Sequence, residues 1–352
     1  MKKAVLIMAY GGPDSLADIE PYLLDIRGGR PTSPELIAEI RARYAQIGGR
    51  SPLLEITCAQ ASALEQQLNA PRSGVAPGSG APDSGSEDDY RVYVGMRHWK
   101  PYIRDVVAQI AADGYQSGLA FCMAPHASKM STGAYLQKLR EAQEALVAAE
   151  EPPLAQEPPL AQEAPYASPA YAPLALDFIE SWFDQPFLIQ ALARKVQAAA
   201  GQFPTDAQTE IHYLFTAHSL PAVLQEQGDP YAGQLQQTAR LLAGELGLNE
   251  SQWTFGYQSA GASGGRWLGP AVEELFPEFA AAGIRNVLVT PVGFMADHVE
   301  ILFDLDIEAQ EIAREHGIRL VRSESLNASP DFIAGLADFI RERIGSKSDE
   351  SR

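Results

Sequence analysis

Three acidic residues near the carboxyl-terminal end of the chain have the spacing of one helix face. Glu300, Asp304 and Glu308 follow one another at intervals of four residues in the stretch VLVTPVGFMADHVEILFDLDIE, residues 287–308. On an α-helix such residues lie on one side, where like charges repel each other and cost helix stability. A solvated surface stripe is one interpretation. Because the helix is expected to start at the carboxyl end of a strand, where open α/β sheets bind ligands, we favour a metal or proton path leading inward.

His218 is the natural partner for Glu300, because it follows another predicted strand at residues 211–216 and is expected at the same edge of the same sheet. A histidine beside a carboxylate suits a divalent metal with mixed nitrogen and oxygen ligands, or an acid–base pair working near neutral pH. Ser219 follows directly, but the chain contains no G-x-S-x-G elbow, which argues against a serine hydrolase. His298 is expected to point to a different side of the helix from Glu300.

Arginines gather in residues 27–50, a segment that holds five arginines and no lysine. The planar guanidinium group binds carboxylates through paired hydrogen bonds. Some of these arginines are expected to pair with neighbouring glutamates, and the others make this segment the best candidate for binding an anionic ligand. The five are Arg27, Arg30, Arg41, Arg43 and Arg50.

Alternating strands and helices must position these residues. Both halves of the chain show the alternation, which predicts parallel, doubly wound sheets of the α/β class. Asp297 is a suitable N-cap for the acidic helix, with Glu300 completing a capping box. We expect two similar Rossmann-like domains with a cleft between them. The expected units are residues 1–150 with a flexible insertion at 71–89, a Pro-rich low-complexity insertion at 151–173, a second domain at 174–327 that starts with a strand at 174–178 and carries the metal site, and a helix and tail at 328–352.

The composition excludes several classes of protein. With 352 residues, 46% of them hydrophobic, the chain can bury two cores. A net charge of −18 argues against nucleic-acid binding. Cys58 and Cys122 are too few for a disulfide framework or a cysteine-ligated iron–sulfur cluster. No segment reaches the ~18 apolar residues of a membrane-spanning helix, so we expect a cytoplasmic protein without stable membrane insertion. We expect a monomer, because no predicted amphipathic helix obviously lacks a partner.

These motifs together resemble the ferrochelatase family, and most of all its bacterial, water-soluble branch, the coproporphyrin III ferrochelatases. The resemblance covers nearly the whole chain apart from the two insertions. The matching segments are MAYGGP (8–13), DIRGGR (25–30), GGRSPL (48–53), APHASKMSTGAY (124–135), TAHSLP (216–221), GYQSAG and RWLGP (within 256–270) and PVGFMADHVEILFDLDIE (291–308).

The resemblance implies a lyase that inserts Fe²⁺ into a porphyrin in haem biosynthesis, with coproporphyrin III as the expected substrate and coproheme as the product. It implies that His218 and Glu300 take up the metal and handle the pyrrole protons, with Asp304 and Glu308 as further metal or proton carriers. Fe²⁺ is then a substrate, no other cofactor is needed, and transient contact with neighbouring haem-pathway enzymes is expected. The implied substrate-binding residues are Tyr10 on the opposite side of the macrocycle, Arg27, Arg30, Arg43, Tyr44, Ser51, Tyr135 and Trp267.

One departure and three alternatives stay open on the sequence alone. Relatives often carry a second arginine where this chain has Gly28, so one propionate contact is either lost or taken over by Arg30. The substrate could be protoporphyrin IX instead. Cobalt chelatases for reduced rings commonly rely on histidine pairs, whereas only His218 stands in a matching motif here. A non-catalytic haem or metal carrier would use the same residues but gives no reason for Glu300 beside His218.

Overall fold

Two parallel sheets form the framework of the protein. The computed structural model describes residues 2–71, 89–150, 174–261 and 265–350, so the predicted insertions at 71–89 and 151–173 lie, apart from residues 71 and 89, outside the described residues. The strand orders are β2-β1-β3-β4 and β6-β5-β7-β8, and all pairs are parallel. The predicted α/β class with two similar doubly wound domains is confirmed. The strands are β1 (Lys2–Ala9), β2 (Asp89–Met96), β3 (Ser117–Cys122), β4 (Ala175–Ile179), β5 (Ile211–His218), β6 (Trp253–Gln258), β7 (Asn286–Thr290) and β8 (Arg319–Arg322).

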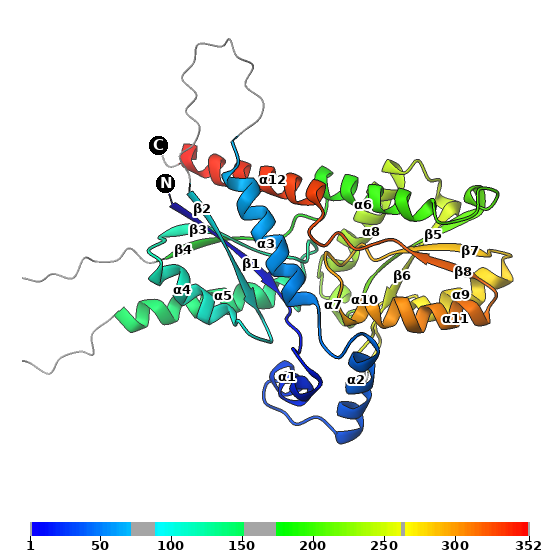
Figure 1. The fold of residues 1–352 in the computed structure, drawn as a ribbon, viewed down its shortest axis with the longest axis horizontal. Helices are drawn as coiled ribbons and strands as arrows, with labels where there is room; N and C mark the ends of the chain where they lie inside the picture. Colours follow the sequence, from blue (N-terminus) through cyan, green and yellow to red (C-terminus); the bar gives the residue numbers. More distant parts are fainter. Residues whose placement is uncertain (1, 72–88, 151–173, 262–264, 351–352) are drawn as a thin grey trace, which may run out of the picture.

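Helices cover both faces of each sheet, which explains why the central strands β1 and β5 are buried along most of their length (Figure 1). In β1, for example, Ala4 to Met8 are fully buried. None of the helices in the described part of the chain is long and apolar enough to cross a membrane. The helices are α1 (Ile19–Ile26), α2 (Pro34–Gln46), α3 (Leu53–Asn69), α4 (Ile103–Ala112), α5 (Thr132–Glu150), α6 (Pro186–Ala200), α7 (Val223–Glu226), α8 (Tyr231–Glu245), α9 (Val272–Ala281), α10 (Val299–Leu302), α11 (Ala309–Glu315) and α12 (Pro330–Glu350).

One hydrophobic cluster joins the two halves. It contains side chains of β1 and β3 from the first sheet, of β5 and β7 from the second, and of α3, α6, α8 and α12. Trp182 lies in this cluster, stacked against Phe187 and Phe332 at centroid distances of 6.0 and 6.2 Å. Because the carboxyl ends of β1 and β5 both point to the junction between the sheets, this shared core fixes the two strand ends relative to each other (Figure 1).

β4 corrects one prediction. The strand expected to open the second domain pairs instead with β3 and completes the first sheet. Leu174 and Leu176 pack in the cluster that also holds Leu139 and Ala142 of α5. A parallel strand that follows a helix can join either sheet. Here the apolar contacts with α5 favour pairing of β4 with the first sheet. The second sheet begins with β5, so the predicted domain start at residue 174 puts this strand in the wrong sheet.

The acidic helix begins one residue later than predicted. His298, with an extended backbone, is the N-cap of α10. The Asp297 carboxylate accepts hydrogen bonds from Ser325 Oγ at 2.7 Å and Asn327 Nδ2 at 2.8 Å instead of capping the helix. The capping box expected between Asp297 and Glu300 is therefore absent.

The acidic helix is also not a continuous α-helix. Residues Asp304–Glu308 form a π-helical segment between α10 and α11. The Phe303 carbonyl accepts hydrogen bonds from both Ile307 N at 3.1 Å and Glu308 N at 3.0 Å. π turns are rare, occur mostly as single turns inside α-helices, and are frequent at functional sites. Asp304 and Glu308 are therefore separated by a π turn, which is wider than the α-helical turn that their spacing of four residues predicts.

The loop after β7 passes close to the end of β5 and depends on a glycine. A Cβ atom added at Gly293 would lie 2.6 Å from Ala217 Cβ and 3.1 Å from its Cα. Since these atoms cannot swing away, Gly293→Ala is expected to lower the free energy of unfolding by about 1–3 kcal/mol. Denaturant unfolding measures this change. Gly233→Ala in α8, where nothing lies within 4 Å, is the matched control, and equal losses in both variants would contradict the packing argument.

Candidate active site

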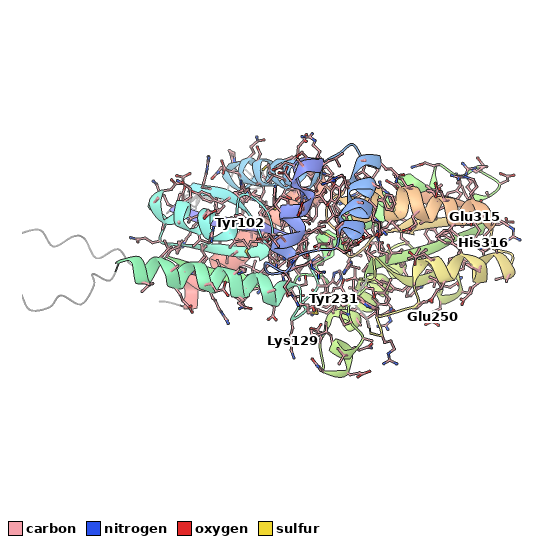
Figure 2. All side chains as sticks on the ribbon, turned by 90° about the horizontal axis from the view of Figure 1, so that it is seen from below. Tyr102, Lys129, Tyr231, Glu250, Glu315 and His316 are labelled. Atoms are coloured by element: carbon pink, nitrogen blue, oxygen red, sulfur yellow. The ribbon has the colours of Figure 1, made fainter. Side chains whose placement is uncertain are left out.

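His218 and Glu300 meet at the carboxyl edge of the second sheet, as predicted from the two strand ends. His218 Nδ1 lies 2.9 Å from Glu300 Oε2, and each side chain is 31% exposed. Tyr231 OH donates a hydrogen bond to the His218 carbonyl at 3.0 Å, and Figure 2 shows Tyr231 where the two halves meet. On the other side, Gln258 Nε2 donates to the Glu300 carbonyl at 2.6 Å. Both backbones are thus held by neighbouring elements.

Mutual attraction outweighs the effect of burial on this pair. Desolvation disfavours the charged imidazole, but the Glu300 carboxylate raises the pKa of His218 above its ordinary value. Desolvation likewise disfavours the charged carboxylate, but His218, and after it His298, hold the pKa of Glu300 well below its usual range. The pair therefore favours a proton on the imidazole and a negative charge on the carboxylate, and a metal ion that binds His218 must displace this proton.

His298 lies closer to Glu300 than predicted. Its Nε2 is 3.8 Å from Glu300 Oε2, its Nδ1 is 3.0 Å from the Ala296 carbonyl, and its ring packs on Phe294. The prediction assumed that residue 298 was helical. Because its backbone is extended, the ring turns back toward the carboxylate.

The other two carboxylates continue from Glu300 along the π segment. Asp304 is 7% exposed, accepts a short hydrogen bond from Ser259 Oγ, and lies 3.8 Å from Arg43 Nη1. Desolvation raises the pKa of Asp304 to about 7, and the charges of Glu300 and Glu308 add to this shift. The half-buried Glu308 closes the segment. The Asp304 carboxylate therefore interacts with the charges of both Glu300 and Glu308.

Tyr10 and its neighbours bring a second set of polar groups from the first sheet. The Tyr10 ring lies 4.7 Å from the His98 ring, with the Arg97 guanidinium 5.9 Å from its centroid. His98 Nδ1 is 2.9 Å from Asp25 Oδ2. Although Tyr10 is 40% exposed, desolvation raises its pKa to about 12, and Glu300 contributes to the shift. The phenol is therefore neutral and near enough to Glu300 to sense its charge.

His98 and Asp25 were missed by the sequence analysis. His98 follows β2, so its place at a strand's carboxyl end was an available signal. Asp25 lies near the end of α1, and nothing in the local pattern indicates that it reaches across to His98.

The predicted arginines divide into two groups. Arg27 and Arg30 are exposed on α1 and the loop after it, and among the described residues neither guanidinium forms an ion pair with a carboxylate. Arg30 Nε donates to the Arg27 carbonyl at 3.1 Å. Arg43 instead pairs with Glu39 at 3.0 Å and turns toward Asp304. Arg41, whose Nε donates to the Leu16 carbonyl at 3.3 Å, also has no carboxylate partner among the described residues, whereas Arg50 pairs with Glu55 at 3.0 Å. Arg27, Arg30 and Arg41 are thus available to an incoming anion, on the α1–α2 projection beside the junction (Figure 1).

The remaining predicted residues lie around the junction at different depths. Tyr44 and Tyr135 are 3% and 4% exposed, with Tyr135 beneath the Arg97 guanidinium at 5.4 Å. Ser51 is half-buried in the turn before α3. Trp267, also half-buried, forms an antiparallel bridge with Pro221, close after His218. In the described ranges, no three His, Cys, Asp or Glu side chains converge in a way that could hold a metal ion.

Comparison with solved structures defines the class of the fold. The chain resembles SirB from Bacillus subtilis with Fe³⁺ at a TM-score of 0.55 and 11% identity, over 97% of this chain and 95% of that one. The sirohydrochlorin chelatase SirB from Bacillus subtilis subspecies spizizenii in complex with cobalt gives a TM-score of 0.52 at 10% identity, with the same coverage of both chains. The fold is of the chelatase type.

Sequence comparison identifies the family. The family model described as Ferrochelatase matches residues 2–344. A ferrochelatase from Deinococcus radiodurans is 39% identical over 96% of this chain and 95% of its own length. The coproporphyrin III ferrochelatase of Bacillus subtilis is 33% identical over 98% of each chain. The chain belongs to the ferrochelatase family, whose members insert a metal ion into a porphyrin in haem synthesis.

Proposed function

We propose that this protein inserts Fe²⁺ into coproporphyrin III to give coproheme. The observation that carries the proposal is the 2.9 Å contact between His218 and Glu300, at the junction that also receives Tyr10. A porphyrin is a flat apolar disc with carboxylates at its rim, so it needs groups above and below its centre and cations at its edge. The two strand ends and the arginines of the α1–α2 projection supply these groups.

His218 and Glu300 would act on the metal face of the ring. As Fe²⁺ binds the pyrrole nitrogens, the pyrrole N–H protons must leave, so the charge that enters with the metal is balanced by the protons lost. Two pyrrole protons leave for each Fe²⁺ that enters the ring, and Glu300, ionised beside His218, would accept them one at a time and pass each on before taking the next. The proton that Fe²⁺ displaces from His218 would leave by the same route. Asp304 and Glu308 would then carry protons away from Glu300 or bring Fe²⁺ toward it. Tyr10, as a neutral phenol, would contact the opposite face of the ring.

Two observations favour coproporphyrin III over protoporphyrin IX. Coproporphyrin III carries more propionates, and Arg27 and Arg30 are free of carboxylate partners among the described residues. Relatives named coproporphyrin III ferrochelatase, from Bacillus subtilis and Listeria monocytogenes, match 98% of this chain at 33% and 34% identity. Arg30 would make the propionate contact that Gly28 cannot make. No resident cofactor is required, since the iron leaves with the ring.

Arginine substitutions test the choice of substrate. Arg27→Ala and Arg30→Ala are each expected to lower kcat/KM for coproporphyrin III by about 10- to 150-fold, because each removes a charge-assisted hydrogen bond worth roughly 1.5–3 kcal/mol. Steady-state insertion assays with both porphyrins measure this loss. Arg314→Ala is the matched control, since this exposed arginine precedes Glu315 and His316 at the far end of the second half (Figure 2). Faster wild-type turnover on protoporphyrin IX would contradict the proposed substrate.

A further inference from the structure

Arg322, the last residue of β8, joins the two ends of the segment that carries Glu300 and Asp304. Its Nε and Nη2 donate to the two carboxylate oxygens of Asp306 at 2.6 and 2.8 Å. Its Nη1 lies 3.4 Å from Asp297 Oδ1. Asp297 precedes α10, and Asp306 lies inside the π segment. The Arg322 side chain is only 14% exposed, so these contacts are largely shielded from water and salt.

Asp297 is itself the centre of a dense hydrogen-bond network. Its N–H donates to Asn327 Oδ1 at 2.9 Å, and its carboxylate accepts from Asn327 and Ser325. Asn327 has a φ of 44°, a strained conformation that surrounding contacts must maintain. Gln60 Nε2 of α3 donates to the carbonyls of Asn327 and Met295. The upstream end of the segment is therefore fixed from both halves of the molecule.

The opposite side of the segment is held by the end of β6. Gln258 donates to the Glu300 carbonyl, and Ser259 donates to Asp304. The π turn therefore lies between β6 and the Arg322 side chain. An isolated helix would return to α-helical hydrogen bonding, because π turns are rare, so external contacts are needed to keep the wider turn.

We propose that Arg322 is a positioning residue for metal insertion: by binding Asp297 and Asp306 together, it holds the π turn and so sets Asp304 beside Glu300. This inference rests on the proposed function, and it concerns how the carboxylates are aligned for Fe²⁺. Among the described residues, Arg322 forms no hydrogen bond or ion pair with any of the four predicted metal or proton carriers, so it acts through the segment it clamps; these four are His218, Glu300, Asp304 and Glu308. The paired geometry requires the guanidinium fork, which lysine lacks.

Arg322→Lys and Asp306→Asn test the proposal. Each is expected to lower kcat/KM for Fe²⁺ by about 10- to 100-fold, the usual effect of losing a group that orients metal ligands, with KM for the porphyrin within twofold of wild type. The double variant should lose no more than the worse single variant, because both break one contact. Arg319→Lys is the matched control, since Arg319 lies on the same strand and donates to the Gln202 carbonyl, away from the π segment.

Hydrogen exchange of the amides in residues 299–309 gives a readout that does not depend on turnover. Both variants should exchange faster in this segment, while the core strands β5 and β7 keep wild-type protection. The proposal would be overturned if kcat/KM fell equally for Fe²⁺ and for the porphyrin. It would also be overturned if hydrogen exchange became faster across the whole second sheet, because Arg322 would then have a merely structural role. If the wild-type protein fails to insert iron, the proposed function is wrong, and unchanged exchange in this segment would separately refute the clamp.

Discussion

Glu300→Gln is expected to abolish measurable iron insertion while leaving porphyrin binding intact. Glutamine keeps the shape of the side chain and can still accept a hydrogen bond, but it carries no charge and cannot take up a proton at neutral pH. General-base catalysis contributes about 10²–10⁴-fold to a rate, and the loss of the negative charge beside His218 also weakens attraction of the cation. Anaerobic assays of Fe²⁺ insertion, followed by absorbance, measure the rate, and porphyrin fluorescence measures binding.

Glu311→Gln is the control for this substitution, because Glu311 is an exposed carboxylate on α11 of the same helical stretch. His218→Ala should reduce insertion to a similar degree. Because the two side chains act as a pair, removing both should cost little more than removing one. Additive losses, or a Glu300→Gln variant with near-wild-type turnover, would contradict a shared role.

Asp304→Asn is expected to remove one part of the pH dependence of the protein's stability. Asp304 has its pKa raised from an ordinary value of 3.8 to about 7, mainly by desolvation. The folded state therefore holds this proton more tightly than the unfolded state does. The stabilisation is complete below pH 3.8 and is lost as the pH rises through about 7, by an amount of at most about 4 kcal/mol. Above pH 7 the protein keeps an ionised, nearly buried carboxylate.

The Asn variant lacks this carboxylate, so its stability relative to wild type should rise between pH 5 and pH 8. Denaturant unfolding at the two pH values measures the difference. Asp331→Asn is the control, because desolvation opposes the charge on Asp331 but Arg194 outweighs it and lowers the pKa of Asp331 below 3.8. Asp331 is ionised in both the folded and the unfolded state between pH 5 and pH 8, so this substitution should change the free energy of unfolding by the same amount at both pH values. If the difference in free energy of unfolding between wild type and Asp304→Asn stays constant from pH 5 to pH 8, the pKa of Asp304 is not raised in the folded protein.

The pairing of His218 with Glu300 could be predicted from sequence because it follows from topology alone. Each residue comes just after a buried strand, and the carboxyl ends of parallel strands in one sheet share an edge. Likewise, the alternation of strands and helices was sufficient for the α/β class. These inferences use patterns that lie within a short stretch of chain.

The features that were missed depend on contacts between distant residues. The π turn differs from an α-helix by a shift of hydrogen bonds at Phe303, and the contacts of Ser259 and Arg322 that hold it come from β6 and β8. His298 was assigned the wrong direction because the helix start was placed one residue too early. β4 was assigned to the wrong sheet because its neighbours in sequence do not reveal its neighbours in space. Each error concerns tertiary packing, not local propensity.

Multiple-turnover iron insertion by the wild-type protein tests the central claim most directly. With Fe²⁺ and porphyrin in large excess under anaerobic conditions, product absorbance should grow far beyond one equivalent per protein, at a rate proportional to protein concentration and faster with coproporphyrin III than with protoporphyrin IX. Tight stoichiometric binding of porphyrin with no insertion above the uncatalysed background would contradict the claim and leave a carrier of haem or metal.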